Sequence, residues 1–532
     1  MCRVSISGLR FEKLSGFLLR PLAGAVLMAL SGVSTLQAEE LEYVGANDGA
    51  GLHGASSLTV SPDNKYIYVA AATDFGLGFF ERGSNGQPSY LDFYETSDLG
   101  SKEIPVKVLL SPDGLSLYAI HKSLDNKSSV VFYGRDMNNG ELDFNSRYEG
   151  LDNIADLAMS KDGRSLYLSG SDALVVFQRD TSTGALNKVE TQYDNIKGVD
   201  GLAGSAGLVL TPDGKYLFVA GTVDDAVAVF SRNTSTGALS FVEALRNDLN
   251  KGITGLAGAI SLALSPDGVN LYVAGARDNA LAIFKRNIIS GSVSYLETWA
   301  QNGINGQRKV LELSGISSVV VSPNGSRVYT SSSKEDAIVV FKTLPQSRKL
   351  DFMEVQAGVS GVLSLTTNPN GLFLYAVSPV DKAGSITVFR TANTAPVTSN
   401  DELTVAAGSA LSVSVLANDS DPDNDALHLL GADNHSVQGG IVGVNSDGTL
   451  TYTAPANFSG SDSFSYFVSD ARDAEEVVGQ VNVTVTPVVA DSIPSDSRSL
   501  AGNGGGSGGG SLNGWMAMLL LIAGALRRRS QY

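Results

Sequence analysis

The strongest constraint on the fold of this chain is a turn motif that repeats along most of its length. An apolar strand runs into Ser or Thr, then Pro, then Asp or Asn, at intervals of 46 to 57 residues. Pro presets φ and the Asp or Asn forms the corner, so each copy marks a tight turn between two strands. The copies are Ser61-Pro62-Asp63, Ser111-Pro112-Asp113, Thr211-Pro212-Asp213, Ser265-Pro266-Asp267 and Ser322-Pro323-Asn324, with variants at Ser160-Lys161-Asp162 and Asn368-Pro369-Asn370.

Each turn opens onto further strands in a fixed order. A second strand such as Tyr66–Val69 follows the turn, a third strand ends in Phe, and a fourth strand such as Leu239–Glu243 alternates apolar and polar residues. The third strands end at Phe80, Phe132, Phe177, Phe230, Phe284, Phe341 and Phe389. Four antiparallel strands at this period are typical of a propeller blade, so the pattern predicts an all-β, seven-bladed β-propeller.

One strand is displaced in the sequence. No fourth strand follows Phe389, but Leu41–Val44, which lies before the first turn, has the same pattern as Leu350–Met353. We therefore predict that the N-terminal strand completes the last blade. This closure removes the unpaired strand edges that an open array would expose.

These turns, the Phe-ending strands and motifs such as Tyr272-Val273-Ala274 resemble the lactonase-like propellers, the 6-phosphogluconolactonase and YVTN-repeat group, over residues 41–391. The resemblance implies the fold. It also implies an alternative function for the chain, an exported lactonase-like hydrolase that acts in the propeller channel.

Lactone hydrolysis needs a general base to activate water and a cation to stabilise the oxyanion. His53 is the catalytic candidate, because it precedes Gly54 in a repeated loop where other copies carry Ala203, Ala257, Ser314 and Ser360. An exposed loop histidine is the alternative interpretation. His121 follows the second strand of blade 2, and no Arg-Glu-His set aligns with the enzymes. The arginines after the Phe-ending strands are expected to be structural or exposed on the rim: Arg135, Arg179, Arg232 and Arg286.

A second module spans residues 394–487, where short alternating strands predict an immunoglobulin- or cadherin-like β-sandwich. The run 418–425 is dense in carboxylates, and alternating Asp oxygens on a loop can hold calcium. The module resembles bacterial cadherin-like and VCBS-type surface repeats, which implies calcium-stiffened linkage or adhesion. By that resemblance the calcium ligands are Asp419, Asp421, Asp423 and Asp470. A solvated acidic turn is the alternative.

The two ends of the chain indicate export. Residues 1–38 have the basic, apolar and small-residue regions of a signal peptide, and the propeller is expected over residues 39–391. A Gly/Ser-rich stalk at 488–510 precedes a hydrophobic segment at 511–532 that ends in an Arg cluster. This order resembles the GlyGly-CTERM sorting tail, which implies cleavage by a rhombosortase-like protease and display on the surface of a Gram-negative bacterium. An inner-membrane anchor facing the periplasm is the alternative.

Charge and cysteine content exclude several classes of site. The net charge of −17 disfavours a nucleic-acid partner, and the single cysteine, Cys2, lies in the signal segment, so disulfides and Cys-based zinc sites are excluded. We therefore predict an exported cell-surface protein whose propeller binds a protein or glycan ligand, with the sandwich as a spacer or adhesion module.

Overall fold

The structure is a computed structural model that describes residues 40–488, apart from 100–101, 124, 126, 304–307, 380–383, 394, 422–424 and 471–475. The predicted signal peptide, the sorting segment and all but the first residue of the predicted stalk lie outside the described residues. Within the described part, no helix is long and apolar enough to span a bilayer.

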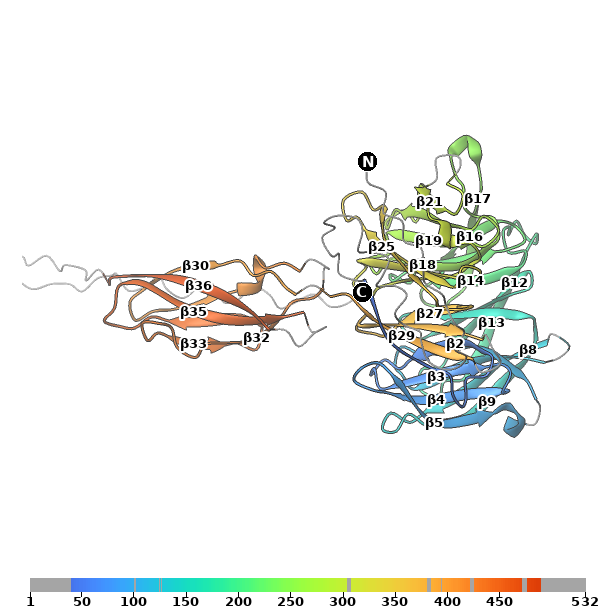
Figure 1. Cartoon of the computed structure of the whole chain (residues 1–532), viewed down its shortest axis with the longest axis horizontal. Coiled ribbons are helices and arrows are strands. Elements are labelled where there is room, and N and C mark those ends of the chain that lie inside the picture. The colour runs from blue at the N-terminus through green and yellow to red at the C-terminus, as the bar shows by residue number, and fades with distance from the viewer. Residues whose placement is uncertain are drawn as a thin grey trace, which may run out of the picture.

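Seven antiparallel sheets form the propeller, as the repeats predict (Figure 1). The first strands of neighbouring blades contact one another around a closed ring. Blade 1 comprises β2 (Ala55–Val60), β3 (Tyr66–Ala71), β4 (Gly76–Arg82) and β5 (Pro88–Glu95); blade 2 comprises β6 (Ile104–Leu110), β7 (Ser116–Lys122), β8 (Lys127–Arg135) and β9 (Leu142–Asp152); blade 3 comprises β10 (Ile154–Met159), β11 (Ser165–Gly170), β12 (Ala173–Arg179) and β13 (Leu186–Tyr193).

The remaining blades follow the same order, and three short 3₁₀ helices lie between blades. Blade 4 comprises β14 (Ser205–Leu210), β15 (Tyr216–Gly221), β16 (Ala226–Arg232) and β17 (Leu239–Arg246); blade 5 comprises β18 (Ala259–Leu264), β19 (Asn270–Gly275), β20 (Ala280–Arg286), β21 (Val293–Ala300) and the added β22 (Arg308–Lys309); blade 6 comprises β23 (Ile316–Val321), β24 (Arg327–Ser332), β25 (Ala337–Thr343) and β26 (Leu350–Ala357). The 3₁₀ helices are η1 (Thr96–Leu99), η2 (Leu249–Lys251) and η3 (Leu311–Leu313).

The N-terminal strand closes the ring, which confirms the prediction. Blade 7 has the strand order β1 (Leu41–Asn47), β29 (Ser385–Thr391), β28 (Phe373–Ser378) and β27 (Ser364–Thr367). In this sheet Tyr43 pairs with Phe389. The start of β1 is also held by blade 6, because Glu40 accepts a 2.6 Å hydrogen bond from Arg327 Nε and its backbone N–H donates to Glu354.

The repeated turn is stable because its side chains satisfy its backbone. In the first copy Ser61 donates its hydroxyl to Asp63, while the same oxygen accepts a 2.9 Å hydrogen bond from the N–H of Tyr66. The backbone N–H of Asn64 donates to the Ser61 carbonyl at 2.8 Å. A hydroxyl residue two positions before a carboxylate therefore closes the corner and starts the second strand.

Four buried arginines connect neighbouring blades through this turn, and we call each contact an Arg–Asp latch. Each arginine ends the third strand of one blade and reaches the turn Asp of the blade before it. The pairs are Arg135–Asp63 at 2.9 Å, Arg179–Asp113 at 3.0 Å, Arg232–Asp162 at 3.9 Å and Arg286–Asp213 at 2.6 Å. No arginine in this set has a side chain more than 2% exposed, so these residues are structural.

The arginine and the aspartate of the first latch, Arg135 and Asp63, each have a further hydrogen-bond partner. Arg135 Nε also donates to the hydroxyl of Tyr68 at 2.8 Å. Burial alone would raise the pKa of Asp63, but hydrogen bonds from Ser61 and Arg135 hold that pKa below its usual value of 3.8.

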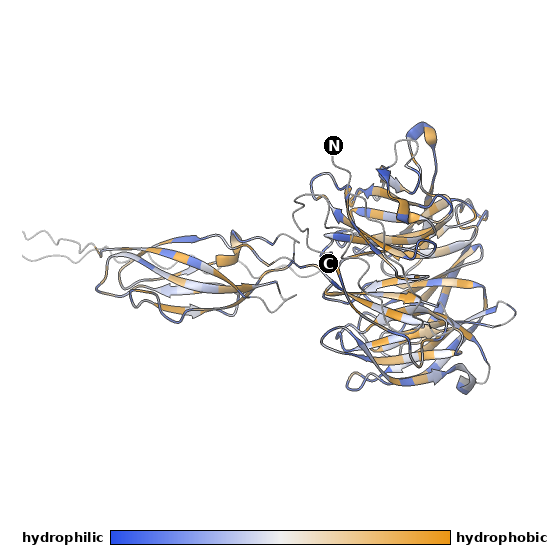
Figure 2. Cartoon of the chain, viewed as in Figure 1, coloured by the Kyte–Doolittle hydropathy of each residue, from blue (hydrophilic) through white to orange (hydrophobic). Residues whose placement is uncertain are grey.

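The apolar core lies between adjacent blades, and Figure 2 shows hydrophobic residues gathered along the strands. Between blades 1 and 2, for example, Tyr68 and Phe79 pack against Val108, Ala119 and Val131. Each blade thus buries both faces, which explains the nearly continuous apolar runs of the second and third strands.

The second module is a β-sandwich of two sheets, as the sequence predicts. One sheet has the order β30 (Asp401–Ala406), β36 (Val477–Thr486), β35 (Gly460–Ser469) and β32 (His428–Ala432); the other has β31 (Ala410–Val413), β34 (Leu450–Thr453) and β33 (Ile441–Val444), and η4 (Val415–Ala417) is a 3₁₀ helix. Tyr452 and Phe464 stack in the core with ring centroids 5.7 Å apart.

Two hydrogen bonds join the sandwich to the propeller side of the chain. Asn324, in the turn of blade 6, donates its amide to Asp425 at 2.6 Å, and Asn393 in the linker donates to Asp470 at 2.7 Å. β36 starts near this junction, and its ten residues extend about 33 Å at the usual rise per residue. β36 therefore runs toward the end of the sandwich away from the propeller (Figure 1).

Candidate functional site

His53 lies in the loop before β2 and contacts a carboxylate. Its Nδ1 is 2.7 Å from Asp74 Oδ1, and its backbone N–H donates to Asp74 Oδ2 at 3.2 Å. Donation from Nδ1 leaves Nε2 as the basic nitrogen of the neutral ring. The side chain is 44% exposed, and among the described residues no arginine or lysine forms an ion pair with Asp74. The contact therefore orients the imidazole as a base, and Asp74 brings no cation to it through an ion pair.

The equivalent aspartates in other blades explain why Asp74 is present. Asp224 and Asp278 accept hydrogen bonds from the backbone N–H groups of Ala203 and Ala257, at 2.9 and 3.0 Å. Asp74 makes the same backbone contact to His53. The aspartate is thus a repeated brace of this loop, and only the imidazole contact is particular to blade 1.

A second His-containing cluster lies in blade 2, where sequence analysis did not find it. Arg147 Nη1 is 3.3 Å from Glu103 Oε1, Ser129 donates to Glu103 Oε2 at 3.0 Å, and His121 Nδ1 is 3.7 Å from that same oxygen. His121 is completely buried, and neither ring nitrogen has a hydrogen-bond partner. Burial, together with the charge of Arg147, lowers the pKa of His121 from 6.5 to about 3.

The position of His121 is occupied by small residues in other blades. A Cβ atom at the corresponding Gly221 or Gly275 would lie 2.3 or 2.2 Å from a backbone carbonyl of the preceding loop. In blade 2 that loop diverges, and Pro105 pairs directly with His121 instead. The neutral imidazole is packed inside the blade, where the charge of Arg147 influences its pKa, and a substrate has no access to it in this arrangement.

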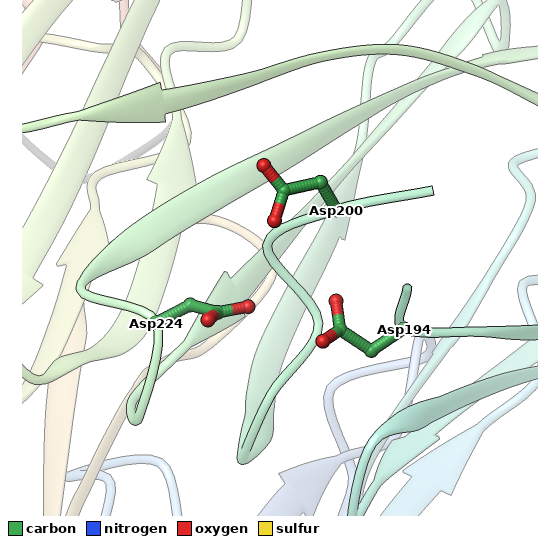
Figure 3. Close-up of side chains that lie close together, drawn as sticks. All are labelled: Asp194, Asp200 and Asp224. Atoms are coloured by element: carbon green, nitrogen blue, oxygen red, sulfur yellow. The ribbon is translucent and has the colours of Figure 1, made fainter. Parts of the chain in front are cut away.

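Three aspartates converge at the loop before blade 4, as Figure 3 shows: Asp194, Asp200 and Asp224 have oxygen atoms within 4.8 Å of one another. Each has a partner, because Asp194 accepts from the N–H of Leu202 at 3.0 Å and Asp200 accepts from Arg246 at 2.6 Å. Burial, with the neighbouring carboxylates, raises the pKa of Asp194. These contacts show that the three aspartates stabilise the loop before blade 4, as Asp74 stabilises the loop before blade 1.

Two surface cavities lie away from these residues. A groove of about 390 Å³ on the rim of blades 5 and 6 is lined by Trp299, Lys309, Val310, Leu311, Glu312 and Phe352. A cavity of about 380 Å³ on the sandwich is lined mainly by polar residues, including Glu402, Ser461 and Asp462. Neither of these two cavities is lined by His53 or His121.

The predicted calcium ligands fall into different surroundings. Asp419 accepts hydrogen bonds from the Tyr466 hydroxyl at 3.0 Å and from the N–H of Ser399 at 2.8 Å. Asp421 accepts from the N–H of Asp425, and Asp470 accepts from Asn393, both near the propeller junction. Asp423 lies outside the described residues. The described contacts therefore give Asp419 different partners from Asp421 and Asp470.

A carboxyl group that sequence analysis did not select lies beside Asp419. Asp401 is 9% exposed, and its Oδ2 is buried without a hydrogen-bond partner. Burial, followed by the charge of Asp419, raises the pKa of Asp401 from 3.8 to about 6. Its signal in the sequence is the Asn400-Asp401 pair that opens the first sandwich strand.

Comparison with known families agrees with the two-part architecture. Residues 144–248 and 262–413 match the family described as lactonase, 7-bladed beta-propeller, and residues 393–486 match the bacterial Ig domain. The matched propeller residues exclude His53, Glu103 and His121.

Individual relatives are distant. An uncharacterized protein of Staphylococcus epidermidis is 29% identical over 195 residues, which cover 34% of this chain and 52% of the relative. The chain thus spans about half the length of the curated relatives that it matches.

Among solved structures, the periplasmic gluconolactonase of Pseudomonas aeruginosa is 21% identical with a TM-score of 0.48, covering 57% of this chain and 86% of its own. A functionally unknown protein of Desulfotomaculum acetoxidans is 14% identical with a TM-score of 0.44, covering 58% of this chain and 87% of its own. The chain folds as a seven-bladed β-propeller that is similar to the lactonase propellers over residues 144–248 and 262–413, followed by a β-sandwich that matches the bacterial Ig domain over residues 393–486.

Proposed function

We propose that this chain is an exported cell-surface protein whose propeller binds a protein or glycan ligand and whose sandwich holds the propeller away from the membrane. The observation that carries the proposal is the direction of the sandwich. The hydrogen bonds of Asp425 with Asn324 and of Asp470 with Asn393 lie at the propeller end of the sandwich. The last strand, β36, starts near that end and finishes at Thr486, about the length of one strand away from it. Any segment that follows Thr486 starts at the end remote from the propeller, as a spacer requires.

The geometry of the histidines also supports binding over catalysis. His53 is oriented by Asp74, which forms no ion pair with an arginine or lysine among the described residues, and His121 is enclosed. The groove on blades 5 and 6, by contrast, exposes apolar side chains to solvent. Function resides in sites and not in the fold itself, so the family match alone does not assign hydrolysis to this chain.

Cell labelling tests the surface location. An antibody against the propeller should label intact cells that produce the full chain. Deletion of residues 511–532 should move the labelled protein from the cells into the medium. Loss of a rhombosortase-like protease should prevent formation of the mature surface form. Labelling that requires opened cells would contradict the proposal.

We further propose that calcium binds at the propeller end of the sandwich. Two features fit a hard cation: Asn393 Oδ1 is buried without a hydrogen-bond partner, and Asp470, which Asn393 contacts, is only 5% exposed. Asp421 and Asp470 with the Asn393 amide oxygen would hold the ion, and its charge would offset their carboxylates. The expected result is a calcium-dependent rise in the melting temperature that Asp470→Asn removes and that Asp447→Asn, at an exposed turn, retains.

The alternative is an exported lactonase-like hydrolase. One observation favours it: Asp74 orients the imidazole of His53 as it would orient a general base. Purified full chain assayed against a panel of lactones decides between the two. Turnover that His53→Ala abolishes would establish the hydrolase, and its absence across the panel would leave the binding function.

A further inference from the structure

We propose that the groove beside Trp299 binds an extended peptide segment of a partner protein, which inserts one large apolar side chain between Leu311 and Phe352. This inference rests on the proposed binding function of the propeller. The groove is the binding site of the propeller, and its ligand is a peptide and not a glycan.

The groove arises where blade 5 departs from the repeat. β21 is the outer strand of its blade, and its last four residues, Glu297–Ala300, are all buried. The outer strands of the other blades stay largely exposed. The burial follows from β22, which pairs in parallel with β21 at Trp299 and Ala300. The ring itself does not need this addition, since six blades close without it.

Trp299 offers a hydrogen bond that no atom of the described residues accepts. Its side chain is 5% exposed, its ring lies 5.2 Å from Phe341, and the Arg308 guanidinium stacks 5.0 Å from its centroid. Nε1 is buried and has no hydrogen-bond partner. Buried donors are normally paired, so an unpaired donor on a residue that lines a groove points to an acceptor supplied by a ligand, which a small shift of the indole would admit. A peptide carbonyl is such an acceptor.

The lining favours a peptide over a glycan. Leu311 is 55% exposed and Phe352 is 39% exposed, and with Val310 they make the groove mainly apolar. A sugar presents many hydroxyl groups, each of which needs a partner, whereas a peptide presents an apolar side chain beside one carbonyl per residue. The outer edge of β22 is also open to backbone pairing.

Charge complementarity specifies the neighbouring residue of the ligand. Arg308 is held by Glu297 at 3.5 Å, but Lys309 at the groove forms no ion pair among the described residues. Glu312 also lines the groove, so a ligand carboxylate is favoured beside Lys309 and disfavoured beside Glu312. The Lys309 ammonium therefore favours a peptide with a carboxylate next to its apolar side chain, on the Lys309 side of the groove.

The test selects ligands for the immobilised full chain from a random peptide library and, in parallel, from a glycan array. Selected peptides should carry an aromatic or large aliphatic residue beside Asp or Glu. Trp299→Phe keeps an aromatic ring but removes the N–H, and should weaken peptide binding roughly fivefold to tenfold. Phe352→Ala should weaken it by about tenfold or more.

Phe144→Ala is the matched control. Phe144 packs on Tyr133 with centroids 6.3 Å apart at 76°, and Phe352 packs on Phe341 at 6.3 Å and 78°. Each substitution therefore removes a ring contact of the same geometry. Only Phe352 lines the groove, so Phe144→Ala should leave peptide affinity unchanged.

The possible failures are distinguishable. Peptides that bind both groove variants like the wild type would overturn the groove and leave the proposed function intact. Glycan ligands without peptide ligands would overturn the peptide inference only. No ligand from either collection would overturn the inference and the proposed binding function together.

Discussion

Asn324 donates a 2.6 Å hydrogen bond to Asp425 and so connects the turn of blade 6 to the acidic loop of the sandwich. The corresponding residue is Asp in blades 1 to 5, where it faces an arginine of the propeller. Blades 6 and 7 carry Asn at this position, Asn324 and Asn370. Asn324 uses its amide at the junction, where an Asp would face the carboxylate of Asp425, whereas Asn370 accepts a hydrogen bond from Asn368 in its own turn.

Asn324→Asp should separate the two domains, because it replaces the donor with a second carboxylate. Small-angle scattering should show a broader distribution of interdomain distances at neutral pH. The double variant Asn324→Asp with Asp425→Asn restores one donor and one acceptor and should return the wild-type profile. An unchanged profile for the single variant would show that the contact does not hold the domains.

The Arg–Asp latches should contribute strongly to propeller stability. Arg135→Met keeps the side-chain volume and leaves Asp63 without its cation, which should lower the free energy of unfolding by about 3 kcal/mol. Arg348→Met is the matched control, since the Arg348–Asp267 pair is partly exposed and should contribute under about 1 kcal/mol. Urea unfolding followed by tyrosine fluorescence measures both, and equal losses would refute the distinction.

Closure of the ring by β1 should also be measurable. Leu41 is 1% exposed and packs between blades 6 and 7, so Leu41→Ala should lower the free energy of unfolding of the propeller by about 2 to 4 kcal/mol. Glu42→Ala, at the neighbouring exposed position, should have little effect. If both variants unfold like the wild type, β1 does not close the ring in solution.

The sandwich should be destabilised by ionisation of Asp401. Its pKa is raised from 3.8 to about 6, so between these values the folded chain binds a proton that the unfolded chain has released. Stability from this group therefore falls as the pH rises from 3.8 to 6 and stays low above pH 6, and Asp401→Asn should raise the unfolding free energy by about 3 kcal/mol near pH 8.

The gain from Asp401→Asn should vanish below the unfolded pKa of 3.8, where both forms are neutral. Glu402→Gln, one residue on and exposed, is the control and should show no such gain at either pH. A gain that is independent of pH would point to packing and not to charge.

The ring could be predicted from the sequence because each blade repeats local signals. The turn motif and the seven Phe-ending strands fixed the blade count, and the missing fourth strand after Phe389 required a partner from elsewhere. Leu41–Val44 had the right alternation, and the pairing of Tyr43 with Phe389 confirms the inference. Local pattern and strand counting sufficed since blades are nearly identical units.

Contacts between blades could not be predicted in the same way. The sequence showed Asp63 and Arg135 as separate repeated residues, and their pairing across 72 positions depends on which blade edges meet. Glu103 was missed since it lies where blade 2 departs from the repeat, and no periodic signal marks it. The side-chain clusters around His121 and Asp194 arise from loops with individual sequences, whose shape repeat analysis does not supply.

His121 should make the propeller sensitive to acid. Its pKa falls from 6.5 to about 3 on folding, so between these values the unfolded chain binds a proton that the folded chain excludes. Stability from this group is fully present above pH 6.5 and declines as the pH falls toward 3, by at most about 1.4 kcal/mol per pH unit.

His121→Leu fills the same enclosed site without a titrating group. The difference in unfolding free energy between about pH 7.5 and about pH 4.5 should therefore be smaller in this variant than in the wild type, by roughly 3 kcal/mol. His428→Leu is the control, because His428 is exposed on the sandwich and should leave the pH dependence of the propeller unchanged. Equal slopes for His121→Leu and the wild type would mean that protons reach the imidazole in the folded ring, and that the Glu103–Arg147 pair accommodates the charged form.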